Sequence, residues 1–409
     1  MTTQMHEMSS HPTAVARAVV IVEAQLVATP PWPTGPYPVA NEVVQATADR
    51  RETYYVPRAA RSLWGAPDEP RRWHREPRAD ETLTGLPVLG VEFLQLPVFV
   101  DPLKAVVAIH VDLGNDPLAS LVGVRCTNDG GFPDGSAIDD ITDGACTGIA
   151  GSVRNTTLTF VAFRDGVPEG PYGPSIPWAD TEQWLRVLAT ATPPSMYTPD
   201  PTMPPPEVSL LSNTWRALVM RDGMAFLALD VAALSDPHIA KGFAELYVRS
   251  IYADAIILGR MQRLALDELA QQLSAQKIGK PEASNLRKLE TRLDEFRQTL
   301  WWQHISGHES VNVFLRQYHK QHNMPELLGQ IVSDLNDSAR LQGVIEGERS
   351  ARSLDLITKV GFPAGAVLGA APIWIEFGWA KALLATAIAA AAGGTFYWIE
   401  KLVRSGTKR

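Results

Sequence analysis

Five aspartates lie close together in a Gly-rich segment, CTNDGGFPDGSAIDDITDGAC, that runs from Cys126 to Cys146. Carboxylate oxygens clustered on a flexible loop suit a hard cation such as calcium or magnesium. The spacing matches no EF-hand loop, which needs ligands at alternating positions, a central Gly and a final Glu. A divalent-cation site and a solvated acidic loop are therefore both open, and the candidate ligands are Asp129, Asp134, Asp139, Asp140 and Asp143.

Four histidines form two closely spaced pairs, His304 with His308 and His319 with His322. Each pair would share one face of a helix. A zinc site would require the two pairs to meet in space, and exposed helix histidines are the alternative. The two cysteines of the chain are too few for a disulfide framework, and we expect both to be reduced thiols.

Enzyme signatures are missing from the sequence, which has no Gly-rich phosphate loop, no Gly-x-Ser-x-Gly and no His-Glu-x-x-His. The formal net charge of −8 gives no basic excess of the kind that nucleic-acid-binding proteins carry. We therefore expect a protein that is not an enzyme and has no nucleic-acid partner.

The composition and periodicity of the sequence change along the chain, and with them the elements expected to position these residues. Residues 1–13 predict a disordered leader, and residues 14–235 predict a mixed α/β cytoplasmic domain. Residues 41–85 are polar and Arg-rich with no clean period. The predicted helix is Trp178–Ala189, and the predicted strands are Ala16–Ala28, Gly90–Val100, Lys104–Leu113, Thr156–Phe163 and a hairpin within Thr214–Asp230 that turns at Asp222-Gly223.

Residues 236–353 predict long helices that form a stalk. Five apolar residues recur there at alternating steps of three and four, which is the spacing of a coiled-coil seam. Packing within one subunit and assembly between subunits both explain such a seam. The seam residues are Leu286, Leu289, Leu293, Phe296 and Leu300.

The last part of the chain predicts a membrane hairpin. Residues 360–375 and 382–399 carry no charge, and with their flanks each approaches the roughly 20 residues that cross a bilayer. The predicted transmembrane helices are 354–375 and 379–399, within residues 354–400, followed by a basic tail at 401–409. Basic residues flank the pair on one side, so we expect both termini in the cytoplasm of a bacterial cell and the hairpin in its inner membrane. The alternative is an Ala/Gly-rich helical pair buried in a large soluble protein.

The order of parts resembles the CorA family of divalent-metal transporters. The segments LRKLETRLDEFRQTLWWQHIS and RSLDLITKVGFPAGAVLGAAPIW look like that family's stalk and first membrane helix, and the resemblance covers about residues 215–409. It implies a CorA-like fold with an α+β soluble N-terminal domain, a homopentamer, and magnesium as the cation. The family's Gly-Met-Asn signature is absent, because the matching place reads PIWIEFGW.

The resemblance implies a cation-conducting pore lined by the first membrane helix. A ring of Glu376 carboxylates would attract cations at the outer mouth. Small residues along the span would allow close helix packing in a homo-oligomer, and a solvated turn residue is the alternative role for Glu376. The pore residues expected on this basis are Glu376, Gly378, Asp355, Lys359, Gly365 and Gly369.

A second hypothesis is that the protein is anchored in the bilayer but does not transport ions. A fold can persist while its site changes. The loss of the Gly-Met-Asn signature therefore also favours a membrane-anchored sensor or effector, of the kind used in bacterial defence, whose cytoplasmic domain binds a partner or signal.

Overall fold

The long apolar strand β1 lies in the middle of a mixed sheet. The structure, a computed structural model, describes residues 13–40, 51, 53–125, 135–149, 155–229, 243–275 and 283–356. The strands in chain order are β1 (Thr13–Leu26), β2 (Gly65–Ala66), β3 (Glu69–Pro70), β4 (Arg72–Arg75), β5 (Thr82–Leu83), β6 (Leu86–Gln95), β7 (Lys104–Asp112), β8 (Cys146–Gly148), β9 (Thr156–Phe163), β10 (Ser209–Leu210), β11 (Trp215–Val219) and β12 (Gly223–Ala228).

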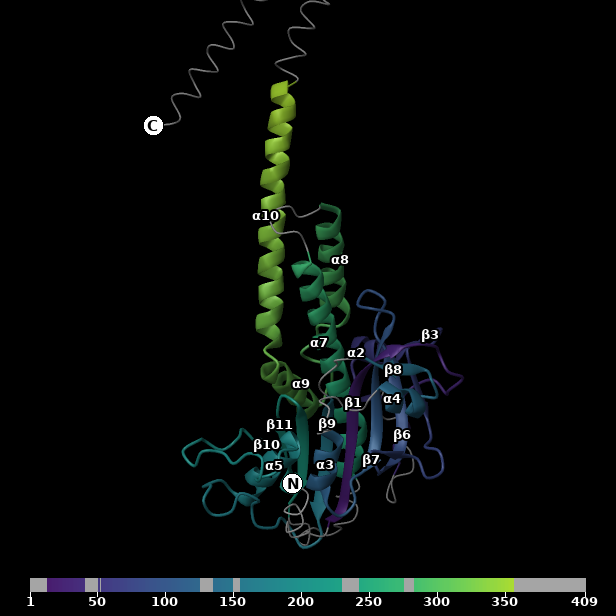
Figure 1. Ribbon diagram of the computed structural model, residues 1–409, viewed down its shortest axis with the longest axis vertical. Helices are drawn as coiled ribbons and strands as arrows, with labels where there is room; N and C mark the ends of the chain where they lie inside the picture. Colours follow the sequence, from purple (N-terminus) through teal and green to yellow (C-terminus); the bar gives the residue numbers. More distant parts are fainter. Residues whose placement is uncertain are drawn as a thin grey trace, which may run out of the picture. The chain divides into compact units, whose positions relative to one another are not determined.

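Ten of these described strands form one sheet, in the order β10-β11-β12-β9-β1-β7-β6-β4, with β5 on β6 and β8 on β1 (Figure 1). Strand β1 pairs antiparallel with both β7 and β9. Strands β9 and β12 run parallel. A parallel pair requires a crossover connection, and helix α5 (Asp180–Thr190) lies in this crossover and packs on β12, β9 and β11.

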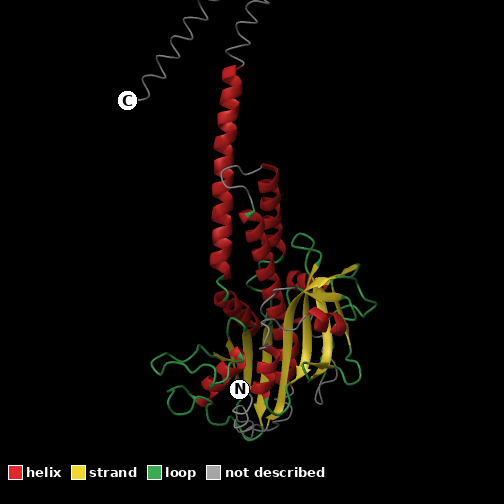
Figure 2. Cartoon of the chain, viewed as in Figure 1, coloured by secondary structure: helices red, strands yellow, loops and turns green. Residues whose placement is uncertain are grey.

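Helices cover both faces of the sheet (Figure 2). Alternate residues of β1, such as Val20 and Val22, pack in one core with α5 and with α3 (Pro117–Arg125) and α4 (Gly135–Ile141). The residues between them, such as Val19 and Ile21, are equally buried but lie on the other face. A strand buried on both sides reads as a continuous apolar run, which explains the composition of β1.

Three later elements, η2 (Val248–Tyr252), α7 (Ala253–Ser274) and α9 (Glu309–Gln321), contact strands of the sheet. The π-helical turn η2 leads into α7, followed by α8 (Ala283–Thr299), α9 and α10 (Met324–Leu356). Helix α7 packs on β7 and α9 on β11. Helix α7 is apolar on most of its circumference in its first half, so it is buried on the sheet.

The seam of α8 is covered by the chain itself. Leu289, Leu293 and Phe296 are buried, and two polar contacts join α8 and the residue after it to α7. The Gln262 side chain donates to the Leu300 carbonyl at 2.6 Å, and Arg292 donates to the side chain of Gln272. These contacts favour packing within one subunit over a coiled coil between subunits.

The chain divides into two compact units, residues 1–275 with 287–333, and residues 276–286 with 334–409. The sheet, α7, α9 and nearly all of α8 belong to the first unit. In the second unit, the described part of α10 is polar over most of its length and leaves Leu341 and Val344 exposed.

The expected fold class is therefore corrected. Among the residues that the structure describes, no helix is long and apolar enough to cross a membrane. Helix α10 has the length, but its sequence is charged throughout, and charges are costly in lipid. The first unit is built on a ten-stranded mixed sheet, and of the later helices η2, α7 and α9 pack on it. Only the first three residues of the predicted hairpin, 354–356, are described. The described residues do not support the expected membrane and ion-transport roles.

Candidate functional site

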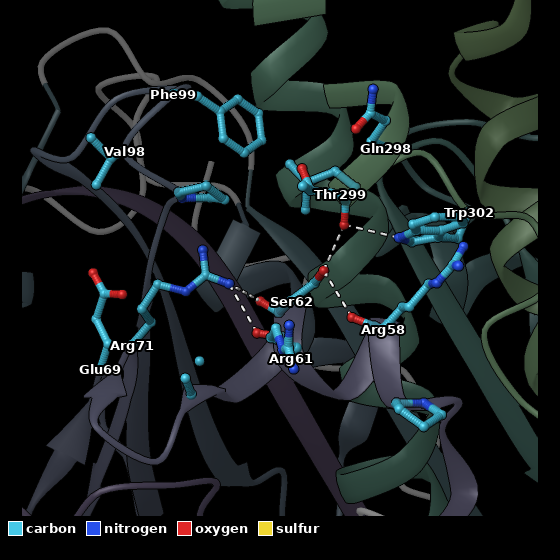
Figure 3. A pocket seen from close by; sticks show the side chains of 15 residues that line it. Arg58, Arg61, Ser62, Glu69, Arg71, Val98, Phe99, Gln298, Thr299 and Trp302 are labelled. Carbon is cyan, nitrogen blue, oxygen red and sulfur yellow. Dashed lines mark hydrogen bonds between the residues drawn. The ribbon is translucent and has the colours of Figure 1, made fainter. Parts of the chain in front are cut away.

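A cleft of about 510 Å³ opens beside the short helix α2 (Pro57–Trp64). Its other walls are the β2–β3 turn, the loop at 97–99 that follows β6, and the segment 298–302 at the end of α8 (Figure 3). Sites for small organic ligands usually have volumes of roughly 300–1,000 Å³. The cleft is therefore large enough for such a ligand and far larger than a single small ion requires.

Three arginines line this cleft. Arg58 and Arg61 come from α2, and Arg71 follows β3. In the described part of the chain, none of the three forms an ion pair with a carboxylate, and Glu69 is the only acidic side chain in the lining. A guanidinium offers several N–H donors in a planar fork that matches carboxylate and phosphate groups. Glu69 acts on Arg71 electrostatically, and the other two arginines leave the cleft with an excess of positive charge suited to an anion.

Arg71 is held in place by the end of α2. Its Nη2 atom donates to the carbonyl oxygens of Arg61 at 3.1 Å and Ser62 at 2.9 Å, which belong to the last turn of the helix. The Arg61 carbonyl also accepts from the Gly65 backbone N–H, and a cation near the carbonyl end of a helix is favourable. Burial lowers the pKa of Arg71, but an arginine stays charged in proteins. The remaining N–H groups of this ordered guanidinium have no partner among the described residues.

Gly65 makes the turn that brings Arg71 to this helix end. Its φ is +85°, a left-handed conformation that favours glycine. A Cβ atom at this position would lie 2.3 Å from the Glu69 carbonyl oxygen and 2.9 Å from the Arg71 nitrogen. The close passage of β3 past the end of α2 therefore depends on a residue without a side chain.

A hydrogen-bonded bridge joins the two long walls of the cleft. The Ser62 hydroxyl lies 2.7 Å from the Thr299 carbonyl and 3.2 Å from the Arg58 carbonyl, so its single proton is best donated to Thr299. The indole N–H of Trp302 donates to the same Thr299 carbonyl at 2.9 Å (Figure 3). The bridge ties α2 to the end of α8.

Aromatic and apolar groups form the rest of the lining. The Arg58 guanidinium lies over the Trp302 ring, 5.2 Å from its centroid, which orders this arginine without neutralising it. On another wall, Pro97, Val98 and Phe99 line the cleft, and 70% of Val98 is exposed. The cleft thus combines cationic groups with an apolar wall.

Next to Arg71 in sequence, Arg72 belongs to a buried ionic cluster. Its Nη2 atom lies 2.9 Å from Glu92 on β6 and 2.7 Å from Asp254 on α7. Asp254 also accepts from Arg51 at 2.6 Å. Burial alone would raise the pKa of the Glu92 carboxyl, but Arg72 and Arg51 hold it well below its ordinary value. The cluster fixes β4, and with it the position of Arg71, against α7.

The structure describes three of the five aspartates that the sequence grouped as a cation site. Asp139 and Asp140 lie on α4, and Asp143 lies on the turn after it. The Asp143 carboxylate is 3.4 Å from Arg75 and 3.3 Å from Arg78, and Asp140 is 3.6 Å from Arg78. Arginines therefore face these two carboxylates. The other two candidates, Asp129 and Asp134, lie outside the described residues.

The histidine pairs have packing roles where the structure describes them. His319 is buried on α9, with Nε2 2.6 Å from the side-chain oxygen of Gln262. Burial lowers the pKa of both His319 and His322 to about 4. His308 stacks on Tyr54. Within the described ranges, no group of three or more His, Cys, Asp or Glu side chains could hold a metal ion.

Asp355 lies on the last turn of α10. The other residues expected to line a pore lie outside the part of the chain that the structure describes, namely Lys359, Gly365, Gly369, Glu376 and Gly378.

The cleft was not predicted from the sequence. Residues 41–85 showed no clean period, and their arginines were spread among polar neighbours. The available signal was the segment PRAARSLWG, in which Arg58 and Arg61 are three residues apart and so share a helical face before a glycine. Nothing in the sequence pattern indicated that Arg71 lines the cleft, because its position beside α2 depends on the turn at Gly65.

The fold and the cleft together describe a mixed α/β protein with an arginine-lined cleft beside its ten-stranded sheet. No protein-family model matches the chain, and no curated protein matches it in sequence.

Proposed function

We propose that the α/β region is a sensor or effector module that binds an anionic ligand in the arginine cleft. The observation that carries this proposal is the gathering of Arg58, Arg61 and Arg71 around one cleft with no carboxylate ion pair among the described residues. Like charges held close together repel one another, although solvent weakens this repulsion at the exposed Arg58 and Arg61. An anion that binds there offsets this repulsion and makes charge-assisted hydrogen bonds.

The residues that line the cleft favour ligand binding over catalysis. No His, Cys or Lys side chain lines the described cleft, and its only carboxylate belongs to Glu69. Its buried hydroxyl, on Ser62, already lies between two carbonyl oxygens. A nucleophile or general base needs a partner within hydrogen-bond reach to activate it. The cleft supports recognition more than catalysis.

The position of the cleft suits a sensor. One wall belongs to α2 and β3, and the other to the end of α8, so a ligand that touches both would favour the arrangement in which they are close. A ligand shifts a conformational equilibrium only through its different affinity for the two states. A ligand that contacts both walls would bind the state with the walls close together more tightly than a state with the walls apart.

The test is calorimetric titration of the full chain with pyrophosphate at low and high salt. We expect saturable binding that weakens as salt screens the charges. Arg61→Gln should weaken it by at least about tenfold, because a hydrogen bond to a charged group contributes about 1.5–3 kcal/mol. Arg164→Gln is the matched control, since Arg164 is an exposed arginine outside the cleft.

No saturable binding, or equal losses in Arg61→Gln and Arg164→Gln, would refute an anion site in this cleft. Circular dichroism of both variants would show that each retains the fold.

A further inference from the structure

We infer that the ligand is a nucleoside phosphate carrying about two negative charges, with its phosphate on the arginines and its base against Phe99. This inference rests on the proposed function, because it names the class of anion that the cleft takes.

The charge of the lining sets the charge of the ligand. Three arginines and one glutamate give the cleft a formal excess of two positive charges, 3 − 1 = 2. A phosphate monoester carries about −1.5 to −2 at neutral pH. One such group balances the formal charge of the cleft.

The volume and the apolar wall require more than a phosphate. The cleft measures about 510 Å³, and its apolar side consists of Pro97, Val98 and Phe99 together with Leu300. A free inorganic anion would leave this side unfilled. A ligand with a flat apolar part joined to the phosphate covers both kinds of surface.

Phe99 is the best platform for that flat part. Its ring is half-buried, lines the cleft, and makes no stacking contact with another aromatic ring in the described chain. By contrast, one face of Trp302 is already covered by Arg58. A base stacked on an aromatic side chain gains affinity with little dependence on sequence, because every base has a π-face.

Gln298 supplies a group that could read the edge of a base. This exposed residue also lines the cleft, and its side chain is labelled in Figure 3. An amide carries both a donor and an acceptor. The cleft therefore holds, in one place, groups for the phosphate, for the face of a base and for its edge.

The experiment compares ligands that share a phosphate and differ in the base. The full chain is titrated with the four ribonucleoside 5′-monophosphates, with ribose 5-phosphate and with inorganic phosphate. We expect at least one nucleotide to bind about tenfold or more tightly than ribose 5-phosphate, since stacking on one aromatic side chain accounts for about that factor.

Three variants and one control locate the contacts. Phe99→Ala should remove the advantage of the nucleotide and leave ribose 5-phosphate binding unchanged, and Phe99→Tyr, which keeps the ring, should restore it. Arg61→Gln should weaken both ligands. Met196→Ala, at an exposed apolar residue outside the cleft, is the control and should change neither.

The outcomes separate the two proposals. Ribose 5-phosphate binding as tightly as every nucleotide, or a nucleotide advantage that persists in Phe99→Ala, would overturn the assignment of a base site while the anion site stands. Binding of no anion at all, pyrophosphate included, would overturn both.

Discussion

His110 on β7 shows how one buried side chain makes the stability of this protein depend on pH. Its Nε2 lies 3.3 Å from Glu92, inside the ionic cluster. Burial lowers the pKa of His110 to about 4 from its ordinary value of 6.5. The imidazole therefore stays neutral in the folded protein at pH values where it is already protonated in the unfolded chain.

We expect the free energy of unfolding to fall as pH is lowered from about 6.5 to about 4. Between these values the unfolded state binds a proton that the folded state does not, so protonation favours unfolding. His110→Gln should make this decline shallower, by up to about 1.4 kcal/mol per pH unit. Urea denaturation of both proteins at several pH values measures the difference.

The decline should persist in part in His110→Gln, because burial also lowers the pKa of His319 and His322 to about 4. Identical slopes for wild type and His110→Gln would contradict the assignment of a neutral, buried His110.

At the scale of elements, the β2–β3 turn is the feature on which the cleft depends. It reverses the chain directly after α2 and delivers Arg71 to the carbonyls of the last helical turn. Gly65 has no room for a Cβ atom, whereas Gly35, which also has positive φ, has nothing within 4 Å of that position.

Gly65→Ala should therefore destabilise the protein more than Gly35→Ala. Both variants carry the strain of an alanine at positive φ, about 1–3 kcal/mol, but only Gly65→Ala must also displace β3. It should in addition weaken anion binding, because Arg71 moves with the strand. Thermal unfolding and titration with pyrophosphate measure both effects.

Equal melting temperatures and equal affinities for the two glycine variants would show that the cleft tolerates a shift of this turn.

The regular elements were the part of the fold that the sequence predicted well. The hairpin at Asp222-Gly223 is confirmed as β11 and β12, and the predicted strands at 104–113 and 156–163 are β7 and β9. Their signal was local, a run of apolar β-branched residues ended by turn residues. The short strands β2 to β5 had no such signal, because their pairing depends on partners that lie elsewhere in the chain.

At the scale of the molecule, the seam of α8 tests how the protein is assembled. Phe296 is completely buried by its own chain and contacts the ring of Trp301, while its neighbour Glu295 is exposed. A seam formed within one subunit contributes to the folding of that subunit, and a seam between subunits contributes to association.

Phe296→Ala should lower the free energy of unfolding by about 3–5 kcal/mol, the usual cost of truncating a buried aromatic side chain. Glu295→Ala should change it little. Unfolding monitored over a hundredfold range of protein concentration should give one midpoint for each protein. A midpoint that rises with concentration in wild type and not in Phe296→Ala would instead place the seam between subunits.

The sequence by itself determined where the longer strands and the later helices form, because alternation, helical spacing and turn residues are local properties. The fold class predicted from the sequence was wrong. It rested on the order of parts along the chain and on the apolar composition of segments, and neither shows which helices pack on the sheet. The tertiary structure decided the cleft and the ionic cluster. Arg72, Glu92 and Asp254 meet from β4, β6 and α7, and only folding brings together charges that lie so far apart in the chain.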